Sequence, residues 1–226
     1  MLRFTRRGAV MAAAALALAA CGSSSEDDAS SADATKAASD KVVLQDIIFG
    51  DPDAPVTLIE YASWTCPACL SFHTRIMPTV QADYIDTGKV RLVFREFPTA
   101  PANVTVAGFA IARCAPEERY YDVLDELFVR QDAILTLARQ GGPVVEALKQ
   151  IAANHGIDGD DAFQACLDDQ GNRDAIRASI AAATAKDVNA TPTFFLNGEQ
   201  MSSNDWITPV SFSAALDAAI SAAESD

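Results

Sequence analysis

The sequence has no long hydrophobic run. Its longest apolar stretch, Ala9–Ala20, has twelve residues, whereas a membrane-spanning helix needs about 20. It also has no internal repeat, and its composition excludes collagen, a coiled coil and a wholly disordered chain. Half of its 226 residues are hydrophobic, which is enough for one sizeable core in one domain, or in one domain with an insertion.

Positive charge is scarce. Lysine and arginine number 17 against 31 acids, so the net charge is −14. Residues 1–20 contain three arginines and no acid, and the rest of the chain therefore carries −17. Such a chain repels phosphates, which excludes nucleic acid and anionic lipid surfaces as expected partners.

The N-terminus reads as an export signal. Residues 1–20 combine a basic start, an apolar run and small residues at a cleavage site. The site, Leu18-Ala19-Ala20-Cys21, resembles the lipobox of bacterial lipoproteins, in which the residue matching Cys21 is acylated and becomes the mature N-terminus. The alternative is an ordinary signal peptide with a chance cysteine. The adjacent arginines Arg6 and Arg7 leave the general and the twin-arginine export routes open.

The next segment, residues 21–40, is predicted to be a flexible tether. It is rich in serine, alanine and acids, and it has no aromatic or β-branched aliphatic side chain. It cannot bury enough surface to offset its ordering entropy. Its reach is on the order of 25 Å, so the resemblance predicts a folded body attached by lipid and held just clear of a membrane.

The body, from residue 41, alternates between strand and helix signals. Val56–Tyr61, Val90–Phe94 and Thr193–Leu196 are β-branched and aromatic runs that predict strands. An Asn-Gly turn and residues 199–201 follow the third strand and predict a hairpin. Helical periodicity covers Pro67–Ile85, with a kink expected at Pro78.

Two further helical regions complete the body. Residues 102–187 are rich in alanine and have apolar residues at helical spacing, and Ser211–Ala223 predicts a closing amphipathic helix.

A CxxC motif carries the chemistry: Cys66-Pro67-Ala68-Cys69 follows a predicted strand and opens a helix. Near the start of the helix, unpaired N–H groups and the helix dipole favour a thiolate at Cys66. Pro67 suits the first helical position, because it has no N–H to lose. Cys69, one turn further in, is expected to be more buried and to act as the resolving thiol.

The alternative for a CxxC motif is half of a zinc site. That site needs a second pair of ligands, and Cys114 and Cys166 stand singly while His73 and His155 lack ligand spacing. We therefore predict redox chemistry with no metal site and no cofactor.

A proline far along the chain completes a family resemblance. Pro192 stands at the start of a predicted strand, where proline is tolerated for structural reasons alone. Together with residues 60–69 and Phe72-His73, however, the segment 191–195 resembles the DsbA-like branch of thiol:disulfide oxidoreductases. The resemblance implies an α/β thioredoxin fold, residues 41–101 and 188–226, with an all-helical insertion at 102–187.

The resemblance also assigns roles to residues. Thr191 and Pro192 match a cis-proline loop that packs against the active-site disulfide and pairs with the main chain of a substrate. Glu60 matches a buried acid that relays a proton to or from Cys69; the alternative is an exposed acid on an edge strand. We interpret His73 as a surface or packing histidine.

The two remaining cysteines, Cys114 and Cys166, lie on apolar faces of predicted helices. Some relatives have a structural disulfide between these helices, and we expect one here; two buried free thiols are the alternative. Such a bond would contribute about 4 kcal/mol in the chain-entropy model.

The function that the resemblance implies is an exported, monomeric oxidase. It would introduce disulfides into reduced secreted client proteins, and a membrane redox partner would reoxidise it. Because Ala68 replaces the histidine of the strongest oxidants in the family, we expect a weaker oxidant. A reductase or isomerase on the same fold is the alternative among enzymes, and a Cu(I)-binding lipoprotein is the alternative outside them.

Overall fold

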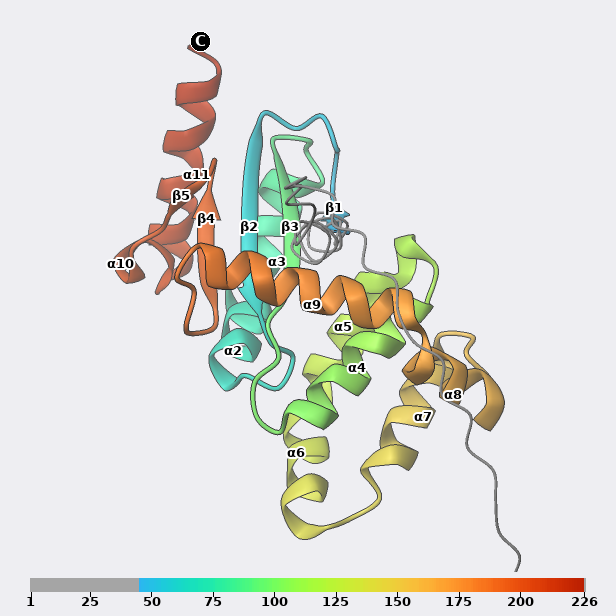
Figure 1. The fold of residues 1–226 in the computed structure, drawn as a ribbon. Helices are drawn as coiled ribbons and strands as arrows, with labels where there is room; N and C mark the ends of the chain where they lie inside the picture. The colour runs from blue at the N-terminus through green and yellow to red at the C-terminus, as the bar shows by residue number, and fades with distance from the viewer. Residues whose placement is uncertain (1–44, 226) are drawn as a thin grey trace, which may run out of the picture. The chain divides into compact units, whose positions relative to one another are not determined.

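A five-stranded mixed sheet forms the centre of residues 45–225, which are the residues that the computed structural model describes (Figure 1). The strand order is β1-β3-β2-β4-β5. Strands β2 and β3 are parallel, and the other neighbours pair antiparallel. The bounds are β1 Ile47–Phe49, β2 Val56–Ala62, β3 Val90–Glu96, β4 Thr193–Leu196 and β5 Glu199–Gln200. The three predicted strands and the hairpin are confirmed.

The alternation of side chains along β2 divides the sheet into two faces. Leu58, Glu60 and Ala62 are fully buried and point to one face, where Leu58 and Ala62 belong to the main hydrophobic core. Tyr61 points to the other face and packs in a smaller cluster with Ala183 and Phe195. β2 is therefore a central strand, buried on both sides.

Three helical segments connect β2 to β3, where the sequence predicts one helix kinked at Pro78. They are α2 Pro67–Arg75, α3 Met77–Val80 and the π-helical turn η1 Gln81–Ile85. The break falls at Ile76, two residues before the proline. Pro78 has no N–H to continue the hydrogen-bond ladder of α2, but it fits the first turn of a new helix.

The region between β3 and β4 is entirely helical, as expected. After α9 the chain returns across the sheet to β4 (Figure 1). The bounds are α4 Ala102–Cys114, η2 Glu117–Arg119, α5 Tyr120–Val129, α6 Gln131–Gln140, α7 Val144–Asn154, α8 Asp160–Asp168 and α9 Gln170–Ala185.

The chain ends in a short helix, α10 Ser203–Trp206, and in α11 Pro209–Ala223. The sequence predicts α11 but not α10. The α/β class is confirmed. No helix within residues 45–225 has the length and hydrophobicity that crossing a bilayer requires. The proposed signal at 1–20, the tether at 21–40 and Cys21 lie outside the described residues.

Candidate functional site

The CxxC motif lies where β2 gives way to α2. After Ala62 the chain turns, and the N–H of Cys66 donates to the carbonyl of Ser63 at 3.0 Å. Cys66 is the N-cap of α2, and its sulfur accepts a hydrogen bond from the N–H of Cys69 at 3.4 Å. Pro67 occupies the first turn. The local sequence thus places the sulfur of Cys66 at the N-terminus of α2, where it accepts a backbone hydrogen bond.

The two thiols are not bonded to each other, and their pKa values are shifted in opposite directions. The pKa of Cys66 is lowered to about 6, first by a hydrogen bond from the Cys69 thiol and then by contacts with Thr191 and with backbone N–H groups, against the opposing effect of burial. The pKa of Cys69 is raised by burial, by its hydrogen bond to Cys66 and by the charge of Glu60. Cys66 is therefore a thiolate at neutral pH, whereas Cys69 stays protonated.

The loop that precedes β4 lies against the nucleophile. The peptide bond between Thr191 and Pro192 is cis, and the carbonyl oxygen of Thr191 is 3.3 Å from the sulfur of Cys66. Pro67 and Ala68 are exposed, and Ala68 offers no side-chain donor to the thiolate. A segment from β4 and the exposed turn of the CxxC motif thus border the same sulfur.

Residues of the helical region form hydrogen bonds with the turn that contains the CxxC motif. Gln131, at the start of α6, is fully buried, and its amide nitrogen donates to the carbonyl oxygens of Trp64 at 2.6 Å and Cys66 at 3.0 Å. Thr65 shares a buried hydroxyl cluster with Thr105 on α4, at 2.7 Å. Sequence reasoning missed these contacts, because nothing in the local sequence marks a glutamine that acts 65 residues from its partner.

Glu60 is buried completely, on a central strand. The alternative of an exposed acid on an edge strand is wrong. One oxygen of its carboxylate lies 3.2 Å from Nε2 of His73, whose side chain is 4% exposed. His73 is therefore no surface histidine: it is on the face of α2 that packs toward β2 and α5, where its ring stacks on Phe128. The spacing of four residues from Cys69 was the available signal.

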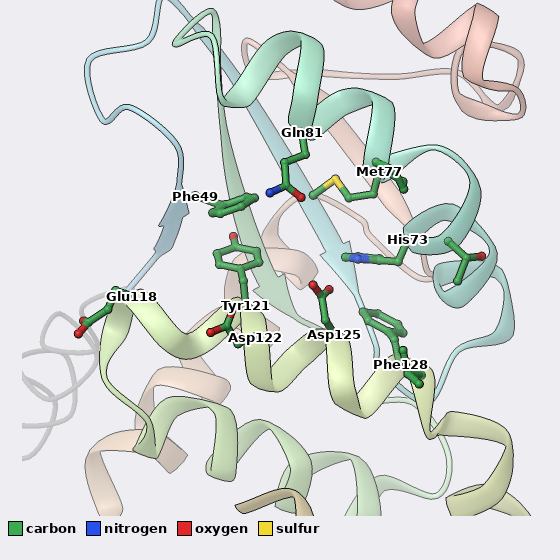
Figure 2. Close-up of a pocket in the computed structure, with 12 residues that line it drawn as sticks. Phe49, His73, Met77, Gln81, Glu118, Tyr121, Asp122, Asp125 and Phe128 are labelled. Atoms are coloured by element: carbon green, nitrogen blue, oxygen red, sulfur yellow. The ribbon is translucent and has the colours of Figure 1, made fainter. Parts of the chain in front are cut away.

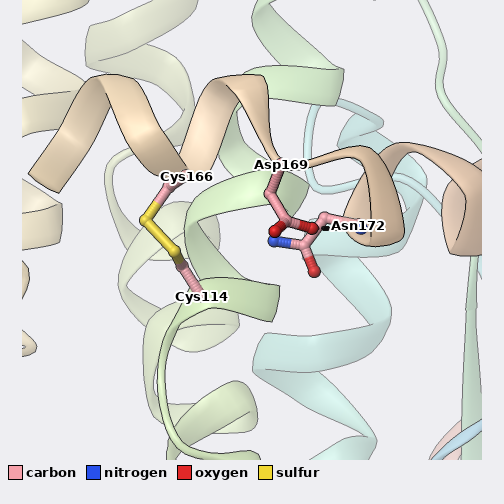
Figure 3. Close-up of a disulfide and its surroundings, with 4 residues drawn as sticks. All are labelled: Cys114, Cys166, Asp169 and Asn172. Carbon is pink, nitrogen blue, oxygen red and sulfur yellow. Dashed lines mark hydrogen bonds between the residues drawn. A yellow bond between two sulfur atoms is a disulfide. The ribbon is translucent and has the colours of Figure 1, made fainter.

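Cys114 and Cys166 are bonded to each other in the structure (Figure 3). The bond joins the end of α4 to α8, with 5.6 Å between the Cα atoms. Close to it, the carboxylate of Asp169 caps α9 by accepting from the N–H of Asn172 at 2.7 Å. The bond belongs to the helical region, apart from the CxxC motif.

Metal ligands do not gather in the part of the chain that the structure describes: no three His, Cys, Asp or Glu side chains there are placed to hold an ion.

A reactive dithiol at the start of a helix, beside a cis-proline loop and on a mixed sheet, defines a thioredoxin-fold protein. The family model described as thioredoxin matches residues 43–218. The chain belongs to that family.

Relatives and solved structures support the fold. Two Rickettsia proteins whose names contain "protein-disulfide oxidoreductase" are similar: the one from R. bellii is 29% identical over 80% of this chain, and the one from R. conorii 31% over 71%. The match covers 66% and 56% of their own lengths.

Among solved structures, Wolbachia pipientis alpha-DsbA1 is 26% identical with a TM-score of 0.64, over 80% of this chain and 94% of that one. Oxidised BdbD from Bacillus subtilis, 19% identical, has a TM-score of 0.62 over 78% and 93% of the two chains. The predicted thioredoxin fold with a helical insertion is confirmed.

Proposed function

We propose that this protein is a thiol:disulfide oxidoreductase that introduces disulfides into exported client proteins. The observation that carries the proposal is that the pKa of Cys66 is lowered while that of Cys69 is raised. A stabilised Cys66 thiolate is a good leaving group, and it makes the disulfide a better oxidant. The names of the Rickettsia relatives support the same activity.

The reaction begins when a client thiolate attacks Cys66 Sγ of the Cys66–Cys69 disulfide. A bond forms between the client sulfur and Cys66, the bond to Cys69 breaks, and Cys69 takes up a proton. A second client thiolate then attacks the client sulfur of the mixed disulfide, and Cys66 leaves as a thiolate. The client loses two electrons and the enzyme gains them, so a membrane redox partner must reoxidise the dithiol.

Glu60 is proposed to exchange the proton of Cys69. Its charge raises the pKa of that thiol, which supports an interaction between the carboxylate and the buried sulfur. Thr191 and Pro192 are proposed to bind the client, because their loop borders Cys66 and an extended peptide can add its main chain there.

The direction is proposed to be oxidation by a monomer rather than isomerisation. The lowered pKa of Cys66 supports an oxidant. Against it, Ala68 is exposed and adds no donor, so a reductase or isomerase remains the competing function. Oxidised protein should rapidly form disulfides in a reduced, unfolded client and rescue a client with scrambled disulfides only slowly; the opposite result would favour the isomerase.

The order of attack can be tested by trapping. With Cys69→Ser, the mixed disulfide at Cys66 has no resolving thiol, so covalent complexes with clients should accumulate. Cys66→Ser is the matched control and should accumulate none. Equal trapping by both variants would contradict the assignment.

Two further proposals concern the rest of the chain. Cys114 and Cys166 form a structural disulfide; peptide mapping that finds both alkylated in unreduced, denatured protein would contradict it.

Cys21 is proposed to anchor the exported protein by lipidation. Cys21→Ser should release the protein from the membrane fraction or block its processing while the purified body keeps its thiol activity; wild type that is already soluble after export would exclude the anchor.

A further inference from the structure

A buried carboxylate and a buried imidazole form a pair between β2 and α2. Oε2 of Glu60 lies 3.2 Å from Nε2 of His73, and the two side chains are 0% and 4% exposed. The other polar atom of each, Oε1 of Glu60 and Nδ1 of His73, is buried with no hydrogen-bond partner in the described part of the chain. Each member of the pair therefore keeps one polar atom that could accept or donate a further hydrogen bond, as a proton relay requires.

One end of this pair lies toward the resolving thiol. Cys69 and His73 are one helical turn apart, on the same side of α2. The charge of Glu60 acts on Cys69 and raises its pKa, after burial and the hydrogen bond to Cys66. The carboxylate therefore interacts with both the buried thiol and the imidazole.

The other end lies at a cavity. His73 lines a cavity of about 400 Å³, together with Met77, Gln81 and residues of α5. Figure 2 shows the imidazole ring extending between Met77 and Asp125. None of the residues that border Cys66 lines this cavity, so it reaches the pair from a side other than the client-binding one.

The reaction requires such a path. Cys69 is 0% exposed, yet it gains a proton whenever the disulfide is reduced and must lose it whenever the disulfide re-forms. While a client is attached to Cys66, the client itself covers the exposed side of the motif. A proton reaches Cys69 most directly from the protein interior.

We propose that His73 carries protons between this cavity and Glu60, and that Glu60 passes them to and from Cys69. The proposal rests on the thiol–disulfide exchange proposed above. It adds His73 to the residues that move the proton, and the cavity as the route by which the proton enters and leaves. His73 acts through Glu60 and is a positioning residue for the carboxylate as well as its proton donor.

Each step of the proposed path is balanced. When the disulfide is reduced, the Glu60 carboxylate takes the Nε2 proton of His73 and passes it to the Cys69 thiolate, and His73 then regains a proton from water that enters the cavity. When the disulfide re-forms, Cys69 gives its proton to Glu60, and the same transfers run in reverse. No electron passes through the pair; electrons move only between sulfur atoms.

The titratable groups around His73 come from four elements. Glu60 on β2 is its partner, Cys69 lies one turn away on α2, and the same cavity is lined by Tyr121, Asp122 and Asp125 of α5 and by Glu118 of η2. No lysine or arginine lines the cavity among residues 45–225. Burial raises the pKa of Asp125, whereas its interaction with His73 lowers it, and Asp122 is paired with Arg119. The charged residues that line the cavity in the described part of the chain are therefore acids.

The test separates the two halves of one reaction. Reduced protein is mixed with oxidised glutathione, Cys66 attacks to form a mixed disulfide, and Cys69 then attacks Cys66 Sγ, forming the protein disulfide and releasing glutathione. The first step depends on glutathione concentration and the second does not, so quenched samples analysed by mass spectrometry yield both rates. The assay is independent of whether the protein acts as an oxidase or a reductase.

His73→Gln keeps a side-chain donor for Glu60 but cannot transfer protons, and His73→Phe keeps the stacking on Phe128. Both should slow the Cys69 step at least tenfold between pH 6 and 8, since a proton-transfer group contributes about 10² or more. The Cys66 step should stay within about twofold. His155→Gln is the matched control, because Nε2 of His155 also lies close to a carboxylate, that of the partly exposed Glu126 at 2.9 Å, and the substitution should change neither step.

Two additional measurements separate proton transfer from a structural role. In His73→Gly, imidazole added to the buffer should restore the Cys69 step, and thiazole, a ring of similar size with little basicity, should not. Glu60→Gln combined with His73→Gln should be no slower than Glu60→Gln alone, because the two groups act in series.

The outcomes are distinct. A wild-type protein that does not react with oxidised glutathione would contradict the proposed function. A reactive wild type whose His73 variants resolve at the wild-type rate, or in which both steps slow equally, would overturn the proton path and leave the proposed function intact. Full activity of His73→Gln alone would show that the histidine only orients Glu60.

Discussion

The stability of the reduced protein should rise with pH through Cys66. The pKa of this thiol falls from 9.0 to about 6 on folding, with the hydrogen bond from Cys69 as the largest cause. Between these values the unfolded chain holds a proton on Cys66 that the folded chain has released. The unfolded state then binds more protons, so the free energy of unfolding increases with pH.

The expected magnitude follows from the shift. Three pKa units correspond to about 4 kcal/mol, gained at up to about 1.4 kcal/mol per pH unit. The gain is complete above pH 9 and is lost as the pH falls through 6. At pH 7 about 1.4 kcal/mol is present, which raises the reduction potential by about 30 mV. At pH 7 Cys69 adds nothing, because its pKa in the folded protein is raised and the thiol is protonated in both states.

Urea unfolding of the reduced protein and of reduced Cys66→Ser, at pH values from 6 to 9, measures this contribution. Other titrating groups cancel in the difference between the two proteins. The difference should grow by about 3 kcal/mol from pH 6 to pH 9, and the ultraviolet absorbance of the thiolate should titrate near pH 6 in the folded wild type only. A difference that is constant with pH would refute the reasoning and show that Cys66 has an ordinary thiol pKa.

Three substitutions test the packing that supports the site, each by urea unfolding. Gly108→Ala places a methyl group 2.4 Å from the ring nitrogen of Trp64, so it should destabilise by about 2 kcal/mol, although alanine in an unhindered helix stabilises. Gln131→Leu leaves buried carbonyl oxygens of the active-site turn with fewer donors and should cost about 2 kcal/mol; a neutral effect would exclude the support from α6. Replacing Cys114 and Cys166 by alanine should lower the free energy of unfolding by up to about 4 kcal/mol, and no change would mean that the bond adds no stability.

The sequence alone determined the elements and the chemistry that depend on neighbouring residues. The β-branched and aromatic run Val56–Tyr61 predicted β2. The order Cys66-Pro67 predicted the start of α2, because an N-cap and a first-turn proline are local features. The greater burial of Cys69 followed from its place one turn inside the helix. The residue composition of a strand and the first turn of a helix require no knowledge of distant segments.

The tertiary structure decided everything that depends on which segments meet. The pairing of β2 between β3 and β4 made it central and buried Glu60. The packing of α2 against α5 decided that His73, expected to be a surface or packing histidine, packs inside and is the partner of that acid. The support of the active-site turn by Gln131, 65 residues away, has no local signal at all. Contacts between segments distant in the chain are selected by the packing of the whole core, and a pattern read along one segment does not contain them.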